Sequence, residues 1–501
     1  MTKYLNQIIL FVCSIALFAA CNGAVAQTQS NMPECLVGAF EGPTGEVQAH
    51  AFKINFNGRP AIGDLDNDGW PDYVISSRNR IAAYDVCGNT FWDIKADTNW
   101  DYPKHSFWNY TTYGYIGDAD GDGKAEFLHI GSDWRTLFIR DGRTGGLKYR
   151  VDLPGDEQWM YVVLARRADD RNGAATRIVA ASASCDPTVS VISIDMRADS
   201  PTVEWYQRKA VHGQGMFMYP PPQTANLDGV GGDEIFHGTL ALDQGGGFIW
   251  LADANSRTGN RGIHAFTVRD IDPTTTGLEA VYSLYGPPSG HPSIIAYGYD
   301  SAQNEIWAAH SPHANRHPHQ HAVGDFFPQA RGLETVVRNS DGYNHWIINS
   351  QGKLLRQGWR VHPGWDGDGE YVQAIEWDDT TGTEILYVER HMSVVSSQAV
   401  RPRLRVVSPL NDRPLTPIFG GGMMEDPQAW VGQSNQANFN PYEAAVLVVD
   451  LFNDGREELF TWGGNRITIF YNSGKTPAPR KWQDQDYRML KKLSCPLYSP
   501  R

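Results

Sequence analysis

Two short acidic segments carry the residues with the clearest chemical meaning in this sequence. Residues 64–72 (DLDNDGWPD) and 118–126 (DADGDGKAE) each place carboxylates at positions 1, 3, 5 and 9 and a glycine at position 6. The glycine permits a sharp turn, so alternate side chains can converge on one point, and carboxylate oxygens are the ligands that calcium prefers. The sequence therefore predicts two calcium sites, with the ligands Asp64, Asp66, Asp68 and Asp72 in the first and Asp118, Asp120, Asp122 and Glu126 in the second.

A second group of candidates lies three residues after the closing acid of each acidic segment and of its weaker copies. These positions are Ile75, His129, His237, Tyr282, Val337, Tyr387 and Thr461, and Arg338 follows Val337. If the copies are equivalent, the side chains occupy related places around one axis and form a funnel wall with proton-transfer groups. The alternative is that the histidines and tyrosines fill a wide core, and the sequence leaves both interpretations open.

Histidines are concentrated in residues 310–321, where five occur within twelve positions. Such a cluster could bind zinc or copper, and alternation along a strand would place His317, His319 and His321 on one face. A surface loop with incidental histidines is the alternative. The glycine-containing segment 211–220 offers His212 and Tyr219 as a base and an acid, although an ordinary connecting loop is the favoured interpretation there.

These candidates must be positioned by a repeated element. The two complete acidic segments start 54 residues apart, and each is flanked by short apolar runs. Weaker copies begin at Asn226, Asp270, Asp325, Glu376 and Asp450. The distance from Asp118 to Asn226 is two periods, so a degenerate unit is expected around residues 162–165 and 177–180.

Strand, acidic loop, strand and turn is the repeat of a β-propeller blade, and no helical periodicity of 3.6 residues is present. The prediction is an all-β protein with a single propeller of eight blades, or seven if the degenerate unit is not a blade.

The N-terminus is typical of an export signal. Lys3 precedes an apolar run from Ile8 to Ala20, and residues 24–26 (AVA) form a cleavage pattern. We therefore expect residues 1–26 to be a signal peptide, residues 27–501 to form the propeller, and the protein to be secreted or periplasmic. A lipid anchor at Cys21 is less favoured, and no segment predicts a membrane span.

Cleavage after residue 26 would leave Cys35, Cys87, Cys185 and Cys495. Four cysteines in an oxidising compartment allow three pairings, among which the sequence does not choose. A bridge from Cys35 to Cys495 is attractive because it would join the two ends of a ring. Buried free thiols are the alternative.

The formal net charge of −14 disfavours a nucleic acid partner, which requires a strongly positive surface. A polyanionic substrate would need a local cationic patch or a metal ion. A monomer is expected.

Several segments resemble a known family. Residues 232–235 (GDEI), 241–250 (ALDQGGGFIW) and 270–273 (DIDP) resemble the propeller of family 11 rhamnogalacturonan lyases, and residues 450–458 (DLFNDGREE) resemble its last blade. The all-β region that precedes that propeller has no room before Asp64. A compact exported propeller is also similar to the bacterial β-propeller ulvan lyases.

This resemblance implies cleavage of a rhamnose–uronate polysaccharide by β-elimination, with ulvan favoured and rhamnogalacturonan as the alternative. The reaction needs a group that neutralises the uronate carboxylate, a base for the C5 proton and an acid for the leaving oxygen. The catalytic candidates are His264, Tyr282, His321 and Arg338, with His129 and His237 as further candidates. The roles suggested are His264 or His321 as base, Tyr282 as acid and Arg338 as neutraliser. Calcium would be structural and could also help to neutralise the substrate.

Two other classes compete with a lyase. A non-enzymatic glycan-binding or adhesion propeller with integrin-like calcium loops would not need titratable groups that face one funnel. A quinone-dependent dehydrogenase propeller is disfavoured because its recurring tryptophan motif is not visible.

Overall fold

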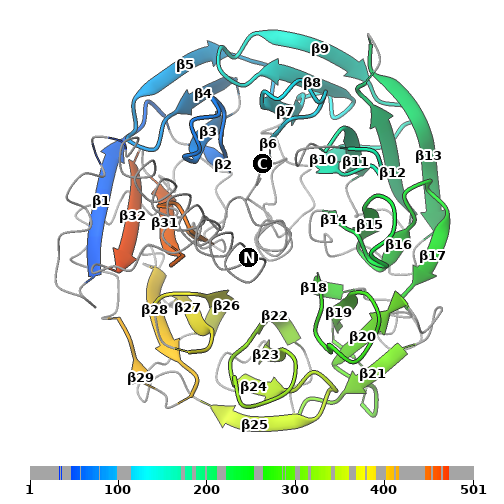
Figure 1. Ribbon diagram of the computed structural model, residues 1–501, viewed down its shortest axis with the longest axis vertical. Helices are drawn as coiled ribbons and strands as arrows, with labels where there is room; N and C mark the ends of the chain where they lie inside the picture. Colours follow the sequence, from blue (N-terminus) through cyan, green and yellow to red (C-terminus); the bar gives the residue numbers. More distant parts are fainter. Residues whose placement is uncertain are drawn as a thin grey trace, which may run out of the picture.

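Eight antiparallel sheets of four strands stand around a central axis in the computed structural model (Figure 1). The structure describes residues 33, 35, 47–56, 58–77, 79–98, 114–170, 175–182, 188–197, 200–210, 222–252, 263–284, 286–287, 289–299, 305–313, 318–339, 345–359, 368–378, 381–390, 402–410, 413–416, 446–452, 455–463 and 466–472. The predicted export signal, the segment 211–220, Cys185 and Cys495 lie outside these residues.

The sheets are numbered as blades 1 to 8 in chain order. Blade 1 comprises β2 (Arg59–Gly63), β3 (Asp72–Ser77), β4 (Arg80–Tyr84) and β5 (Thr90–Lys95). Blade 2 comprises β6 (Tyr115–Gly117), β7 (Glu126–Ile130), β8 (Thr136–Asp141) and β9 (Leu147–Asp152). Blade 3 comprises β10 (Trp159–Ala165), β11 (Arg177–Ser182), β12 (Thr188–Asp195) and β13 (Thr202–Ala210). Blade 4 comprises β14 (Gln223–Ala225), β15 (Glu234–His237), β16 (Leu240–Leu242) and β17 (Phe248–Leu251).

Blade 5 comprises β18 (Ile263–Arg269), β19 (Glu279–Leu284), β20 (Ile294–Gly298) and β21 (Glu305–Ala309). Blade 6 comprises β22 (Pro318–Gly324), β23 (Glu334–Asn339), β24 (His345–Ile348) and β25 (Leu354–Trp359). Blade 7 comprises β26 (Asp368–Ile375), β27 (Glu384–Arg390), β28 (Pro402–Ser408) and β29 (Arg413–Pro414). Blade 8 comprises β30 (Val446–Val449), β31 (Glu458–Gly463), β32 (Arg466–Asn472) and β1 (Val47–Lys53).

The ring is closed by strands from both ends of the sequence. The first strand, β1, pairs antiparallel with β32 over seven residues, from Val47 opposite Asn472 to Lys53 opposite Arg466. It is therefore the outermost strand of the last blade. The predicted eight-bladed propeller is confirmed, and the degenerate unit is blade 3, because β10 to β13 form a complete sheet.

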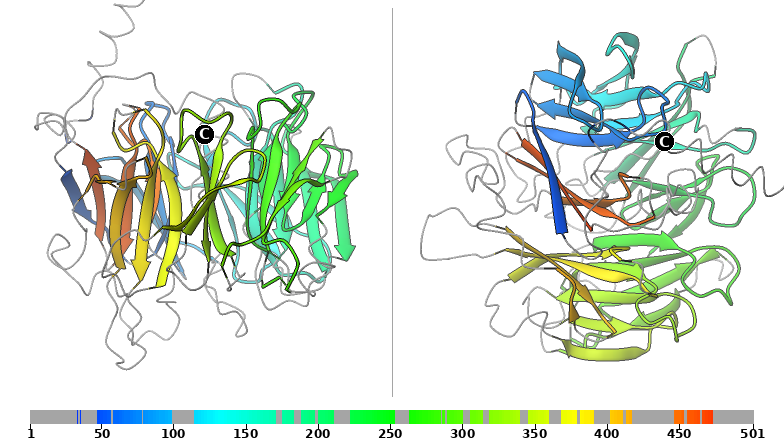
Figure 2. Two further views of the ribbon diagram at one scale, coloured as in Figure 1. Left: turned by 90° about the horizontal axis from the view of Figure 1, so that it is seen from below. Right: turned by 60° about the vertical axis from the view of Figure 1, so that its left-hand side comes forward.

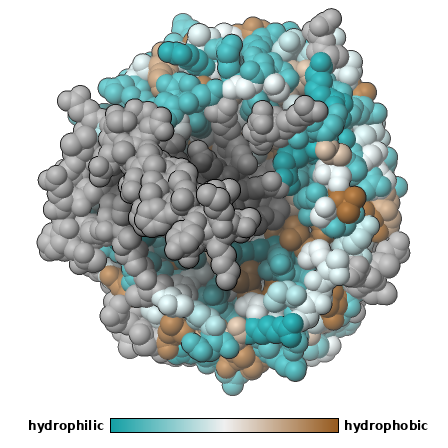
Figure 3. All heavy atoms as spheres, in the orientation of Figure 1, coloured by the Kyte–Doolittle hydropathy of each residue, from teal (hydrophilic) through white to brown (hydrophobic). Residues whose placement is uncertain are grey.

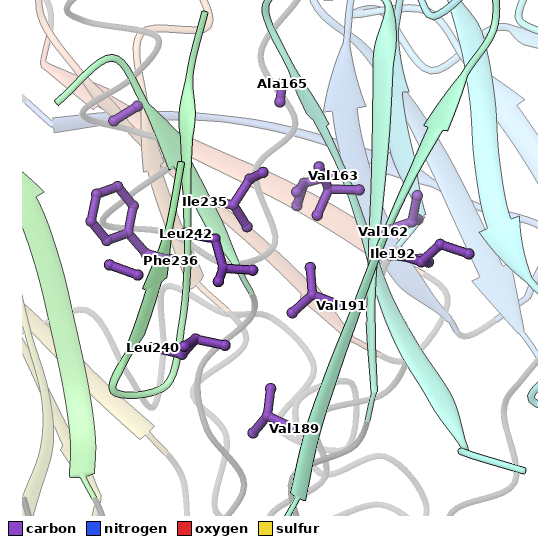
Figure 4. Packing of buried hydrophobic residues seen from close by; sticks show 14 of the residues in the cluster. Val162, Val163, Ala165, Val189, Val191, Ile192, Ile235, Phe236, Leu240 and Leu242 are labelled. Atoms are coloured by element: carbon purple, nitrogen blue, oxygen red, sulfur yellow. The ribbon is translucent and has the colours of Figure 1, made fainter. Parts of the chain in front are cut away.

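The hydrophobic core lies between the blades. The first three strands of a blade are buried on both faces, as in β10, where all seven residues are buried, whereas the outer strand β13 is largely exposed. Figure 4 shows apolar side chains from blades 3 and 4 facing one another, among them Val191 and Leu242. A sheet with two buried faces needs nearly continuous apolar runs, which explains the weak alternation in the sequence.

In blades 2 and 4, a glycine in the turn before the outer strand brings the neighbouring blade close. Gly145 (φ 71°) and Gly246 (φ 82°) have the positive φ that a side chain disfavours, and a Cβ atom there would lie 2.7 Å from the rings of Trp92 and Trp205. Each tryptophan comes from the outer strand of the preceding blade. The indole Nε1 of Trp92 also donates to the carbonyl of Gly142, at 2.8 Å. These contacts link blade 1 to blade 2 and blade 3 to blade 4.

All innermost strands have the same direction because every blade has the same strand order around the axis (Figure 1). The acidic segments join the first and second strands, so they all lie on one side of the ring, here called the loop face. The second strands end on the opposite face. The turned views show the strands running between these two faces (Figure 2). On the face seen in Figure 3, hydrophobic residues are scattered among hydrophilic ones.

One disulfide is formed within the described residues, between Cys35 and Cys87, whose Cα atoms are 5.6 Å apart. The expected bridge from Cys35 to Cys495 is therefore not formed. Cys87 lies in the turn between β4 and β5, and this turn is beside Cys35 in the chain before β1. No helix among the described residues has the length and apolar composition needed to cross a membrane.

Candidate functional site

The closing acid of each acidic segment has a structural role. It begins the second strand of its blade, and its carboxylate accepts a hydrogen bond from a backbone N–H seven or eight residues earlier. The donor–acceptor distances are 2.6 to 2.9 Å for Asp72, Glu126, Glu234, Glu279, Glu334, Glu384 and Glu458. This contact fastens the loop to the strand, and it explains why position 9 persists in copies that have lost the other acids.

The first complete segment brings three carboxylates together. Carboxylate oxygens of Asp64, Asp66 and Asp72 lie within 4.8 Å of one another and could hold a metal ion. Burial, together with repulsion by the neighbouring aspartates, raises the pKa of Asp72 to about 9 and that of Asp68 to about 6. A bound cation would remove this repulsion.

The second complete segment also gathers three carboxylates, Asp118, Asp120 and Asp122, within 4.8 Å. Here a lysine already lies among the acids. The ammonium Nζ of Lys148 lies 2.6 Å from Asp120 and 2.9 Å from Glu126, and 3.6 Å from Asp122. Burial alone would lower the pKa of Lys148, but its hydrogen bonds to Asp120 and Glu126 raise that pKa well above its usual value. The two predicted calcium loops are therefore chemically different.

The difference arises at one backbone position. In blade 2, Arg140 is opposite Leu147 and Ile139 is opposite Tyr149, so Lys148 is the extra residue of a bulge in the outer strand. In blade 1, Tyr84 is opposite Thr90 and Ala83 is opposite Trp92, which makes Phe91 the equivalent residue. The cation of blade 2 is thus replaced by an aromatic ring in blade 1.

Blade 3 carries the reverse charge at this position. Its bulge residue is Glu204, which lies 2.5 Å from Arg167 and 3.1 Å from Arg177. Arg177 begins β11, where the other blades have the closing acid. Blade 3 is degenerate in sequence because its loop has exchanged acid for base, with a compensating exchange in the outer strand.

The residues predicted three positions after each closing acid lie in the second strands, in the packing between blades. All seven are buried, from Ile75 to Thr461. His237 Nε2 lies 3.2 Å from the Ser182 carbonyl of blade 3, and Tyr282 accepts a hydrogen bond from Trp250 of blade 4 at 3.2 Å. Burial raises the pKa of Tyr282 well above its usual value.

His129 is enclosed by aromatic rings. Its ring stacks between Phe127 and Phe138, at centroid distances of 5.5 and 5.1 Å, and its Nε2 accepts a hydrogen bond from Arg140 at 3.1 Å. Burial and the nearby guanidinium lower the pKa of His129 to about 3. The imidazole is therefore neutral at physiological pH.

His321 connects blades 5 and 6. Its Nδ1 lies 2.6 Å from the Ser283 hydroxyl and its Nε2 lies 3.0 Å from the Thr267 hydroxyl, and burial lowers its pKa to about 4. His264 is partly exposed on the innermost strand of blade 5. Among the described residues, the two acidic segments are the only groups of three or more potential metal ligands brought together. His317 lies outside the described residues, so metal binding by the histidine cluster stays a prediction.

Arg338 lies near the end of β23, between blades 6 and 7, and is 1% exposed. Three further polar side chains lie at the same interface: His345, Tyr387 and Arg405. Tyr387 is one of the predicted funnel positions, whereas His345 and Arg405 are not among the residues predicted from the sequence. The available signal for Arg405 was its alternation with apolar residues of β28, whereas β24 shows no such alternation at His345.

Comparisons with known proteins place the chain by fold. No family model and no curated protein matches it. Among solved structures, it is similar to the exotype rhamnogalacturonan lyase YesX, with a TM-score of 0.64 and 18% identity over 91% of this chain and 78% of that chain. It is also similar to Saccharomyces cerevisiae Sqt1, with a TM-score of 0.50 and 8% identity over 85% of this chain and 98% of that chain. These similarities establish the β-propeller class.

Proposed function

We propose that this protein is an exported polysaccharide lyase that cleaves a rhamnose–uronate polymer by β-elimination, with ulvan as the favoured substrate and rhamnogalacturonan as the alternative. The observation that carries the proposal is the similarity to an exotype rhamnogalacturonan lyase over 91% of this chain. The other propeller compared above has a lower TM-score, 0.50.

In the proposed reaction, a base removes the C5 proton of the uronate and the C4–O bond breaks as the C4=C5 double bond forms. The leaving oxygen takes a proton from an acid. His264 or His321 is the proposed base, Tyr282 the proposed acid and Arg338 the proposed neutraliser of the carboxylate. A base must be neutral before it reacts, and the lowered pKa of His321 meets this requirement.

Calcium is the proposed ion of the acidic segments, because their ligands are hard carboxylate oxygens at the spacing of a calcium loop. Residues 64–72 are the stronger candidate, since Phe91 stands where Lys148 supplies a positive charge in blade 2. The ion would hold the loop between the first two strands of blade 1, distant in the fold from Arg338 at the opposite face.

The test is a continuous assay of the purified protein with ulvan and with rhamnogalacturonan, in the presence of calcium. An unsaturated uronate product absorbs at about 235 nm, so an increase in absorbance is expected from β-elimination. Arg338→Gln should reduce the rate by about 100-fold or more, as expected for loss of a group that stabilises developing charge, whereas Arg143→Gln in an exposed turn should not. No absorbance change with either polymer would rule out this function for these substrates.

A glycan-binding propeller without catalysis is the second candidate function. It is favoured by the burial of four of the five candidates for proton transfer, His129, His237, Tyr282 and His321, with His264 alone partly exposed. Binding of ulvan with no change in absorbance would identify this function.

A further inference from the structure

Four polar side chains converge between blades 6 and 7, on the side of the ring away from the acidic segments. In blade 6, Val336 is opposite Ile347, and both pack with Ile385 and Val407 of blade 7 in one apolar cluster. Side chains alternate between the faces of a strand, so the residues two positions along these strands face the same interface. Those residues are Arg338, His345, Tyr387 and Arg405.

The contacts agree with this assignment. Tyr387 is directly opposite Arg405 in the pairing of β27 with β28. The ring of His345 meets the ring of Tyr387 edge-on, at a centroid distance of 4.8 Å. Blades 6 and 7 are neighbours in the ring, as Figure 1 shows.

The interface places positive charge at buried positions. Arg338 is 1% exposed and Arg405 is 9% exposed. Within the described residues, the buried Nε and Nη1 atoms of Arg405 have no hydrogen-bond acceptor and Arg405 forms no ion pair. Burial lowers the pKa of Arg405, and no neighbouring acid opposes this effect. A buried guanidinium without an anion is costly, so it is a feature that a ligand can complete.

Three buried or partly exposed arginines of other blades are paired with acids. Arg166 lies 2.7 Å from Asp233, Arg177 lies 3.1 Å from Glu204, and Arg80 lies 2.5 Å from Asp93. Arg405 differs from them because no carboxylate within the described residues forms an ion pair with it.

The equivalent described positions of the other seven blades carry no such pair of charges. Positions equivalent to Arg338, four residues after the start of the second strand, are Ser76, Ile130, Ala181, Gly238, Ser283, Val388 and Trp462. Positions equivalent to Arg405 on the third strand are Ala82, Phe138, Ile192, Leu240, Ile295, Trp346 and Thr468. The two guanidinium groups are therefore a local departure from the repeat and not a property of every blade.

We propose that Arg405, together with Arg338, binds the carboxylate of a uronate residue at the interface of blades 6 and 7, and that His345 and Tyr387 form the wall beside that sugar. The planar fork of a guanidinium matches the two oxygens of a carboxylate, and a ring edge or face suits the apolar face of a sugar. The inference rests on the proposed function, because it names the place where the acidic polymer is held.

The test measures binding of short uronate oligosaccharides prepared from ulvan, in the free carboxylate form and in the methyl-esterified form. Wild-type protein should bind the free form at least tenfold more tightly than the ester. Arg405→Gln should lose at least tenfold in affinity for the free form and lose the discrimination against the ester. Arg150→Gln, on the exposed face of β9, is the matched control and should behave as the wild type.

Thermal melting of the same variants separates binding from packing. Removal of an unpaired buried charge should leave the melting temperature of Arg405→Gln unchanged or raise it. Arg405→Lys keeps the charge but not the fork and should show an intermediate loss of affinity, which provides a second variant if Arg405→Gln does not fold.

The outcomes separate this inference from the proposed function. Unchanged affinity in folded Arg405→Gln or Arg405→Lys would overturn the site, and so would failure of the wild type to bind either oligosaccharide. Binding that depends on Arg405 without any absorbance change at about 235 nm would support the site and overturn the lyase reaction.

Discussion

At the scale of single residues, Lys148 gives one of two similar acidic segments a cation of the protein's own among its potential metal ligands. Residues 64–72 and 118–126 have the same ligand pattern, and in the second the ammonium group of Lys148 lies between the carboxylates. A lysine in that position and a divalent cation would compete for the same oxygens. The first segment, with Phe91 at the equivalent position, has no such competitor there.

Substitution of Lys148 by methionine should therefore turn the second segment into a cation-dependent one. We expect Lys148→Met to lower the melting temperature in chelator, because the partly buried ion pairs contribute about 1–3 kcal/mol. Added calcium should then raise the melting temperature more in the variant than in the wild type, by binding the folded state.

Lys124→Met is the control, since Lys124 lies in the same loop but is exposed. Equal calcium responses in wild type and Lys148→Met, measured by differential scanning fluorimetry, would contradict this account.

At the scale of the element, each blade is held by the contact between its closing acid and the loop before it. Glu334 is fully buried at the start of β23, and its carboxylate accepts the N–H of Phe327 at 2.9 Å. Burial, with a smaller contribution from Asp325, raises the pKa of Glu334 from 4.5 to about 7. The folded state therefore favours the neutral carboxyl.

This shift predicts a pH dependence with a defined sign. A carboxyl whose pKa is raised by folding stabilises the protein fully below about pH 4.5, and this stability is lost as the pH rises through about 7. Glutamine does not ionise, and its amide oxygen can still accept the N–H of Phe327. Glu334→Gln should flatten the fall in the free energy of unfolding between pH 5 and 8, and be more stable than wild type at pH 8 by about 1–3 kcal/mol.

Denaturant unfolding at pH 5, 6.5 and 8 in chelator measures this effect. Glu305→Gln on the outer strand β21 is the control, because Glu305 is only partly buried and lies outside the loop contact. A pH profile of Glu334→Gln that overlays that of the wild type would refute the prediction.

At the scale of the whole molecule, the ring is closed at blade 8 and fastened to blade 1. Hydrogen bonds between β1 and β32 close the sheet, and Phe52 of β1 packs against Gly88 in the turn between β4 and β5. The disulfide from Cys35 to Cys87 joins the chain before β1 to the same turn. The closure therefore combines a strand pairing, an aromatic contact and a covalent bond.

Removal of the disulfide should weaken the whole ring. The bond closes a loop with a sequence separation of 52 residues, for which the chain-entropy model gives about 4 kcal/mol. We expect the pair Cys35→Ala and Cys87→Ala to lower the free energy of unfolding by about 2–4 kcal/mol. Denaturant unfolding with and without reducing agent measures it: reductant should destabilise the wild type and leave the double variant unchanged. Equal stability of both proteins under oxidising conditions would show that the bond does not secure the closure.

The blade count was accessible from the sequence because the closing acids have a local role. Each fastens a loop to the strand that follows within seven or eight residues, so the spacing of residues such as Asp72 and Glu126 directly marks the blades. Blade 3 lacks this sequence marker because Arg177 occupies the position of the closing acid. Its identity as a blade followed only from the period.

The repeat, the number of blades and the carboxylates of the two acidic segments could be predicted from the sequence alone, because these depend on contacts between residues close in the chain. The partner of Cys35, the placement of Lys148 among the acids, and the placement of Arg338 and Arg405 at one blade interface became visible only in the folded chain. Those contacts depend on bulges, strand registers and blade packing, which join residues that are distant in the chain and leave no fixed spacing in it.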